Sequence, residues 1–205
     1  MTQAAPRTRI QEKNIRLILD AALEVFAQHG FRGATLDQIA QTASLSKPNL
    51  LYYFPSKDAI HAALLEGLLD AWLAPLRALD PDGEPIEEIL GYMLRKLDMA
   101  RELPRESRLF ANEIVQGAPH ILETIEGPLR ALVDEKAALI RGWAEAGRIA
   151  PVNPYHLVFS IWATTQHYAD FDVQVRGILR PEGDMHFQDA AKFLTGLFRR
   201  ALTPD

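Results

Sequence analysis

The chain has 205 residues, of which 48% are apolar and 24% charged, an ordinary composition for a folded protein that argues against disorder. Its net charge of −5 argues against a protein that coats nucleic acid non-specifically over its whole surface. It has no cysteine, which excludes disulfides, thiolate metal sites and cysteine nucleophiles. No apolar run reaches the ~18 residues that span a bilayer and the N-terminus has no apolar signal core, so we expect a soluble, cytoplasmic protein without a membrane partner.

The charge is distributed unevenly along the chain. Residues 1–60 carry a net charge of +2, and the remainder carries −7. A slightly basic head on an acidic body suits a small DNA-contacting part held by a larger domain with another task. This uneven charge indicates DNA binding only in combination with a DNA-binding motif.

The first predicted helix has one apolar face. Ile15, Leu19, Ala22 and Phe26 are spaced by 4, 3 and 4 residues, which is the helical period. We expect this helix to stop at Gly30, because glycine favours the left-handed conformation that ends helices.

Two short helices are predicted next, at about 35–42 and 46–53, joined by Ala43-Ser44-Leu45. Thr35 and Gln38 form a capping-box pattern at the start of the first of them. Ser46 is a good N-cap for the second. This spacing matches a helix-turn-helix, whose second helix enters the major groove while the first braces it.

The second short helix carries side chains suited to DNA. Its polar residues can reach bases or phosphates, and Thr35 and Lys57 lie at helix N-termini that favour phosphate. The predicted DNA-contacting residues are Thr35, Ser46, Lys47, Pro48, Asn49, Tyr52, Tyr53 and Lys57. On spacing alone, an ordinary pair of short helices in a bundle explains the pattern equally well.

Proline and glycine divide the rest into helices of ordinary length. No window shows sustained two-residue alternation, and Pro75 should kink or end the fourth helix. We predict an all-α fold of about nine helices, with an N-terminal three-helix helix-turn-helix domain (1–57) and a larger ligand-binding and dimerisation domain (58–205). The last two long helices are expected at about 154–176 and 184–202.

The stretch from Ile18 to Leu64 resembles the DNA-binding domain of the TetR family of repressors. The resemblance is carried by Ala21–Phe26 with Gly30-Phe31, by Thr35–Ala40, by Ala43–Ser46 and by Leu51–Asp58. It implies a homodimer that binds double-stranded operator DNA and is released by a small molecule. One departure is Pro48, where family members often carry glycine.

The rest of the chain resembles pyrimidine-responsive members of that family. The matching segments are Trp72–Leu76, Ser107–Phe110, Asp134–Lys136 with Ile140–Trp143, and Ile161–Phe171. The resemblance implies uracil or thymine as the effector and control of pyrimidine utilisation and nitrogen metabolism.

A uracil site can be placed on one helix face. Phe159, Trp162, Gln166, Ala169 and Val173 recur at intervals of 3 and 4 residues. An indole can cover a planar ring, and a glutamine amide offers one donor and one acceptor to an N–H/C=O edge. The predicted ligand-binding residues are Trp72, Arg108, Phe110, Trp143, Phe159, Trp162 and Gln166.

Each of these residues also has a plain structural interpretation. Aromatic residues at helical spacing are usually core, Gln166 can bond backbone groups, and Arg108 can pair with Glu113. His167 lies off the Trp162 face and suits a structural role or a dimer contact.

The expected dimer surface lies on the last predicted helix. It comprises Phe187, Ala190, Ala191, Phe193, Leu194, Leu197 and Phe198. A monomer could bury the same residues internally, so this expectation follows from the family resemblance.

Three other functions compete with a pyrimidine-responsive repressor. An enzyme is disfavoured because the chain lacks a G-x-S-x-G elbow, an H-E-x-x-H motif and a Gly-rich phosphate loop, and because its six histidines lack metal-ligand spacing. We therefore expect no catalytic residue, metal or cofactor. The remaining alternatives are a TetR-type regulator of a hydrophobic drug or metabolite, as in efflux control, and a DNA-binding regulator that senses nothing.

Overall fold

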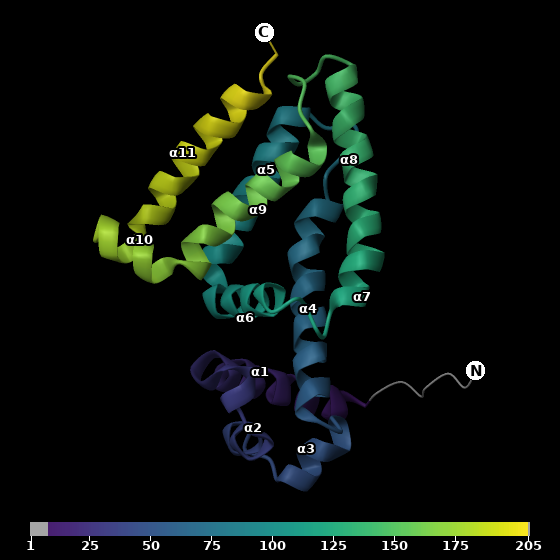
Figure 1. Cartoon of the computed structure of the whole chain (residues 1–205), viewed down its shortest axis with the longest axis vertical. Helices are drawn as coiled ribbons and strands as arrows, with labels where there is room; N and C mark the ends of the chain where they lie inside the picture. The colour runs from purple at the N-terminus through teal and green to yellow at the C-terminus, as the bar shows by residue number, and fades with distance from the viewer. Residues whose placement is uncertain (1–7, 205) are drawn as a thin grey trace, which may run out of the picture.

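The computed structural model describes residues 8–204, and this part of the chain contains helices and no strands. The helices are α1 (Arg9–Gly33), α2 (Leu36–Thr42), α3 (Lys47–Tyr53), α4 (Lys57–Arg77), α5 (Pro85–Glu102), α6 (Pro104–Val115), α7 (Leu122–Thr124), α8 (Arg130–Glu145), α9 (Pro154–Asp170), α10 (Asp172–Leu179) and α11 (Met185–Leu202). A π-helical turn, Ile125–Leu129, joins α7 to α8. In Figure 1, α1–α3 gather at one end, which we call the head, and the larger bundle, which we call the body, lies at the other. The predicted all-α fold is confirmed.

Local capping bonds define the two short helices of the head. The Thr35 hydroxyl accepts from the Gln38 N–H at 3.2 Å, and the Gln38 side-chain oxygen accepts from the Thr35 N–H at 2.8 Å. The Ser46 hydroxyl accepts from the Asn49 N–H at 3.3 Å. Ser44 turns the chain between the helices with a φ of 55°. Both predicted short helices are confirmed within about one residue.

The expected stop of the first helix appears as a break at Gly30. Its φ of 67° and ψ of 168° are not helical, and a short turn continues to Gly33. The break brings Phe31 back over the head, where its ring centroid lies 5.7 Å from that of Phe26 and 4.6 Å from that of His61. Positive φ at this position favours glycine because it has no Cβ.

Helix α4 links the two ends of the molecule (Figure 1). Its first half places Ile60 and Leu64 in the core of the head, and its second half places Leu69 and Leu76 in the core of the body. The helix runs past Pro75 and ends at Arg77. Because α4 is continuous here, the domain boundary between residues 57 and 58 stays a prediction.

By length and composition, α4 is the one helix among residues 8–204 that could cross a membrane. The structure gives its apolar residues another explanation. They are shared between the two cores of the molecule, so the apolar character of α4 follows from packing on both sides.

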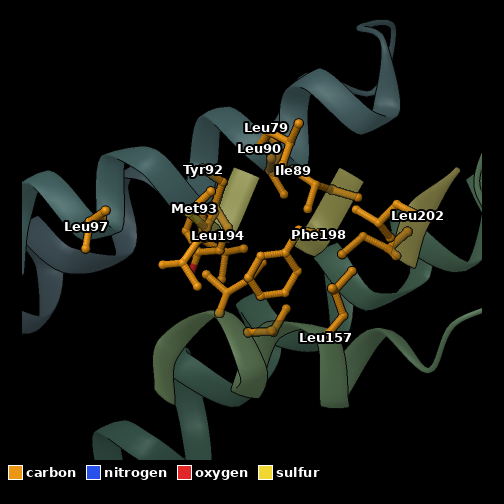
Figure 2. Packing of buried hydrophobic residues seen from close by; sticks show 14 of the residues in the cluster. Leu79, Ile89, Leu90, Tyr92, Met93, Leu97, Leu157, Leu194, Phe198 and Leu202 are labelled. Carbon is orange, nitrogen blue, oxygen red and sulfur yellow. The ribbon is translucent and has the colours of Figure 1, made fainter. Parts of the chain in front are cut away.

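The body is built around α5, which packs against α4, α9 and α11. Figure 2 shows Ile89 and Met93 of α5 close to Leu194 and Phe198 of α11, with Leu157 of α9 beneath them and Leu97 farther along α5. Each fully buried leucine, isoleucine, methionine or phenylalanine side chain contributes ~1.5–3 kcal/mol to the stability of the fold. This core holds α9 at a fixed position beside α6, where the cavity described below is formed.

One predicted helix is wrong in its extent. The helix expected at 154–176 divides into α9 and α10 at Phe171, whose φ of −113° and ψ of 29° are not helical. Val173 therefore leaves the face shared by Trp162 and Ala169, and it is 87% exposed. Because the 3.6-residue period of apolar residues continues through this point of the sequence, periodicity predicts one continuous helix and gives no sign of the bend.

Candidate functional site

The exposed face of α3 is the first candidate site. Lys47, Pro48 and Asn49 are exposed, and Tyr52 is 71% exposed. On the opposite side, Leu50 is fully buried in the core of the head. The helix therefore presents polar and aromatic groups to solvent from a fixed base, as a reading helix requires.

Other predicted DNA-contacting residues have partners inside the head. The hydroxyls of Thr35 and Ser46 cap α2 and α3. The Tyr53 hydroxyl accepts from the Asn14 side chain at 2.8 Å. These residues lie beside the exposed face and hold its two helices in place.

Lysines 47 and 57 differ in their surroundings. The Lys47 ammonium pairs with Asp37 at 2.9 Å across the turn, and both side chains are largely exposed. The Lys57 ammonium instead donates to the carbonyl oxygens of Phe31 at 2.6 Å and Ala34 at 2.8 Å, and lies 4.5 Å from the Phe31 ring centroid. Lys57 thus secures the break after Gly30, and Lys47 stays at the surface.

A cavity of about 670 Å³ opens between α4, α6 and α9 in the body. Its walls are mostly apolar, as is usual for small-molecule sites. Five of the seven predicted ligand-binding residues line it: Trp72, Arg108, Phe110, Trp162 and Gln166. Helices far apart in the sequence thus bring together residues that the sequence placed in one site.

Hydrogen bonds and ring contacts orient the aromatic walls. The Trp162 indole N–H donates to the Tyr92 hydroxyl at 2.6 Å, which fixes the plane of that ring. Burial raises the pKa of Tyr92, so its hydroxyl stays protonated at neutral pH. Trp72 and Phe110 meet edge to face with centroids 5.0 Å apart.

Lys96 and Asp170 bring charge to the same cavity. Lys96 is 5% exposed, and burial lowers its pKa to about 8, although the Asp170 charge opposes this shift. Its ammonium lies 5.2 Å from the Trp72 ring centroid. Burial also raises the pKa of Asp170, against a 2.6 Å hydrogen bond from the Ser107 hydroxyl. Lys96 and Asp170 thus place groups of opposite charge on a cavity whose walls are mostly apolar.

Gln166 and Arg108 provide further donors. Among residues 8–204 the Gln166 amide has no protein hydrogen-bond partner, so its donor and acceptor are available to a ligand. Arg108 donates to the Ala169 carbonyl at 3.3 Å. The alternative pairing of Arg108 with Glu113 is not observed, because Glu113 is occupied by His61 and His120.

Two predicted ligand-binding residues lie away from this cavity. Trp143 on α8 is 4% exposed and packs in the core of the body. Phe159 is 49% exposed on α9, where its ring lies 5.7 Å from that of Trp162. Sequence reasoning missed Lys96 and Asp170, although a lysine in the apolar pattern of the helix 85–102 was a signal for the first.

The polar groups of the cavity do not form a catalytic relay. Ser107 donates directly to Asp170, without an imidazole between them. His167 is exposed and stacks on Phe171, with ring centroids 5.0 Å apart, and within residues 8–204 its ring makes no hydrogen bond to the Ser107–Asp170 pair. The arrangement is suited to holding a ligand.

An apolar surface remains on α9–α11. Four of the seven residues expected at the dimer surface, Phe187, Ala190, Leu194 and Phe198, are buried in the core of the body. Phe193 and Leu197 on the same helix are 62% and 40% exposed. The exposed apolar side chains nearby are Phe159, Phe171, Val173, Ile178, Leu179 and Met185.

Family models cover nearly the whole chain. Residues 18–64 match the model of bacterial regulatory proteins of the tetR family, and residues 65–205 match the YcdC-like C-terminal region. The chain belongs to the TetR family of transcription regulators, whose members act on DNA and are not enzymes.

Individual relatives agree with this assignment. The chain is 49% identical over 183 residues to the HTH-type transcriptional regulator RutR of Escherichia coli, covering 87% of this chain and 86% of that protein. It is 31% identical over 172 residues to the HTH-type transcriptional repressor SCO4008 of Streptomyces coelicolor, covering 82% and 83%. Among solved structures, the putative transcriptional regulator SCO4942 of S. coelicolor covers 93% of this chain and 98% of its own, with a TM-score of 0.74 and 25% identity.

A structure with bound partners has the same fold. AibR in complex with isovaleryl coenzyme A and operator DNA has a TM-score of 0.69 and 16% identity, and the match covers 94% of this chain and all of that one. At this identity the likeness concerns the fold alone.

Proposed function

We propose that this regulator binds operator DNA as a homodimer and is released when uracil or thymine occupies the cavity between α4, α6 and α9. In this role it represses genes of pyrimidine utilisation and nitrogen metabolism in the cytoplasm. The observation that carries the proposal is the cavity itself, which Trp72, Phe110 and Trp162 line together with Gln166, whose amide has no hydrogen-bond partner among residues 8–204. The similarity to RutR over most of both chains supports the same effector class.

The chemistry of the cavity suits a pyrimidine ring. The fixed Trp162 indole offers a flat apolar surface, and Gln166, one turn away on α9, can pair with an N–H/C=O edge. Lys96 and Arg108 can donate to a carbonyl oxygen, and Asp170 can accept from a ring N–H. Cytosine presents an amino group and an unprotonated nitrogen at this edge, so Asp170 would lose the ring N–H, and Lys96 and Arg108 would lose the carbonyl oxygen, that they pair with in uracil.

DNA contacts are assigned to the exposed face of α3. Lys47, Pro48, Asn49 and Tyr52 would enter the major groove, and Thr35, Ser46 and Tyr53 would lie along the phosphates. We leave Lys57 out of the contact set because its ammonium is bonded within the head.

Helix α6 connects the cavity to the head. Helix α6 supplies Arg108 and Phe110 to the cavity and also packs against α1. A ligand that prefers one position of α6 therefore biases the position of the head, and in a dimer it changes the spacing of the two reading helices. The exposed apolar residues of α9–α11 offer the dimer surface.

Calorimetric titration of the purified protein with uracil, thymine and cytosine tests the effector. We expect saturable binding of uracil or thymine at one site per chain and rejection of cytosine. Gln166→Ala should abolish the pyrimidine response while DNA affinity, measured on duplexes selected from a random library, stays unchanged. Gln174→Ala is the matched control, because Gln174 is exposed on α10. Full pyrimidine binding by Gln166→Ala would contradict the assigned contact.

The size of the cavity favours a second candidate effector, a larger hydrophobic drug or metabolite. About 670 Å³ lies within the range of drug-sized sites and exceeds what one pyrimidine fills. Thermal shifts with bulky hydrophobic compounds, and none with pyrimidines, would replace the proposed effector with this one while leaving the DNA-binding role in place.

A further inference from the structure

We propose that His61, Glu113 and His120 form a divalent-cation site, best suited to Zn²⁺, that ties α4 to α6 where the head meets the body. In the sequence these residues are 52 and 7 positions apart, with no metal-binding spacing. The fold brings one ligand atom of each within 4.8 Å of the others. The site is separate from the pyrimidine cavity and does not depend on it.

Two of the three distances between the proposed ligand atoms match those around a tetrahedral ion, and the two imidazole nitrogens lie within 4.8 Å of each other. The Glu113 carboxylate oxygen Oε2 lies 3.2 Å from His61 Nε2 and 3.1 Å from His120 Nδ1. Ligands at the usual ~2.0–2.1 Å from zinc, placed at tetrahedral angles, are separated by about 3.3 Å. Two imidazoles and one carboxylate are also a ligand set that zinc accepts, with a fourth position for water.

The Asp58 carboxylate lies next to one of the proposed ligands, His120. His120 faces Glu113 with Nδ1, and its other nitrogen, Nε2, lies 3.5 Å from the Asp58 carboxylate. Metal-bound histidines almost always direct their second nitrogen to such an acceptor, which fixes the ring and its tautomer. Asp58 is therefore assigned as a positioning residue.

The surroundings hold the ligands in place and leave access for an ion. His61 and Glu113 are 3–4% exposed, and the His120 backbone N–H donates to Glu113 at 2.7 Å. The Phe31 ring packs on both imidazoles, with centroid distances of 4.6 and 5.1 Å. All three proposed ligands line a cavity of about 700 Å³ that can admit the ion and its water.

The location gives a bound ion a structural role. His61 lies on the half of α4 that packs in the head, Glu113 lies on α6, and His120 follows α6. An ion there would cross-link the two helices at the junction through which α6 reaches α1. Arg108 and Asn112 line both this cavity and the pyrimidine cavity, so the two sites adjoin the same face of α6.

Zinc titration of the full-length protein, after treatment with a chelator and dialysis, tests the site. We expect one Zn²⁺ per chain, an increase in Tm on binding, and a Co²⁺ derivative with the visible absorption of four-coordinate cobalt. His120→Gln should weaken zinc binding by at least 100-fold, and Asp58→Asn by about tenfold, the lower end expected for loss of an outer carboxylate. Both variants should keep the wild-type Tm in chelator within a few degrees.

His29→Gln is the matched control, because His29 is exposed and lines the same cavity without joining the cluster. It should bind zinc like the wild type. No stoichiometric zinc binding by the wild type, or equal binding by His120→Gln, would overturn the site. Since uracil is absent from the experiment, failure here leaves the proposed pyrimidine response untouched, and the reverse holds as well.

Discussion

The head and the body of this regulator are specified in different ways. The helix ends of the head are determined by local interactions: two N-caps, and a glycine with positive φ, each act within a few residues. The cavity proposed to bind pyrimidines is assembled from α4, α5, α6 and α9, and the hydrogen bonds beside it join residues 61 to 70 positions apart. A local change should therefore alter the head alone, and a change in long-range packing should reach the ligand.

The sharpest test of this separation is Leu50→Ala. Leu50 is fully buried in the head, and removing its side chain should cost ~2–5 kcal/mol of the stability of that unit. We expect DNA binding to be lost and the amides of α3 to exchange rapidly, because α3 loses its anchor. Hydrogen exchange and calorimetry with uracil measure the two halves separately.

The neighbouring Leu51 supplies the control, since it is 38% exposed and its truncation should cost less than ~1 kcal/mol. If the head and body are independent, pyrimidine affinity in Leu50→Ala changes by less than threefold. Equal loss of pyrimidine binding would show that the shared cluster, which includes Leu109 of α6, makes them one cooperative unit.

An effect of intermediate size is expected in the body, where pyrimidine affinity should depend on pH. Burial sets the pKa of Lys96 at about 8, so its ammonium loses its proton as pH rises through that value. If the ammonium donates to a pyrimidine carbonyl, affinity should fall about tenfold between pH 7 and pH 9, as the protonated fraction does. Lys96→Met should bind more weakly at pH 7 and show little change over this range.

Stability should move in the opposite direction. The pKa of Lys96 is lower in the folded protein than its ordinary 10.5, so between pH 8 and 10.5 the unfolded chain binds more protons. The contribution of Lys96 to the free energy of unfolding therefore rises over that interval. Urea denaturation of the wild type and Lys96→Met isolates it; a wild-type curve that falls more steeply than the variant's would contradict the assignment.

The difference between head and body also explains what the sequence could predict. Thr35 and Ser46 reveal their roles because their capping partners lie three residues away. Trp162 and Gln166, which line the same cavity, could be predicted together because they lie about one helical turn apart in a segment that resembles the family. Lys96, Asp170 and the cluster of His61 with Glu113 acquire their surroundings only through packing between helices, which no local spacing encodes.

Errors in the prediction have the same origin. Trp143 and Phe159 fit the helical period as well as Trp162 does, and only the packing directs one into the core and leaves the other half exposed. The bend at Phe171 lacks both proline and glycine, the residues used to find helix ends. Periodicity records which residues share a face while the helix continues, and it does not record where that face points.

The smallest effect is expected at the surface of the head, from Lys47→Ala. Within the described part of the chain Lys47 pairs only with the exposed Asp37, and such pairs contribute ~0–1 kcal/mol, so stability should be nearly unchanged. If Lys47 turns from Asp37 to a phosphate on binding, the dependence of log affinity on log salt should become shallower by about 1. Lys192→Ala, at an exposed lysine of α11, is the control and should leave the salt dependence as it is. An unaltered slope in Lys47→Ala would remove this residue from the DNA interface, and the exposed Asn49 and Tyr52 would then remain to carry recognition from α3.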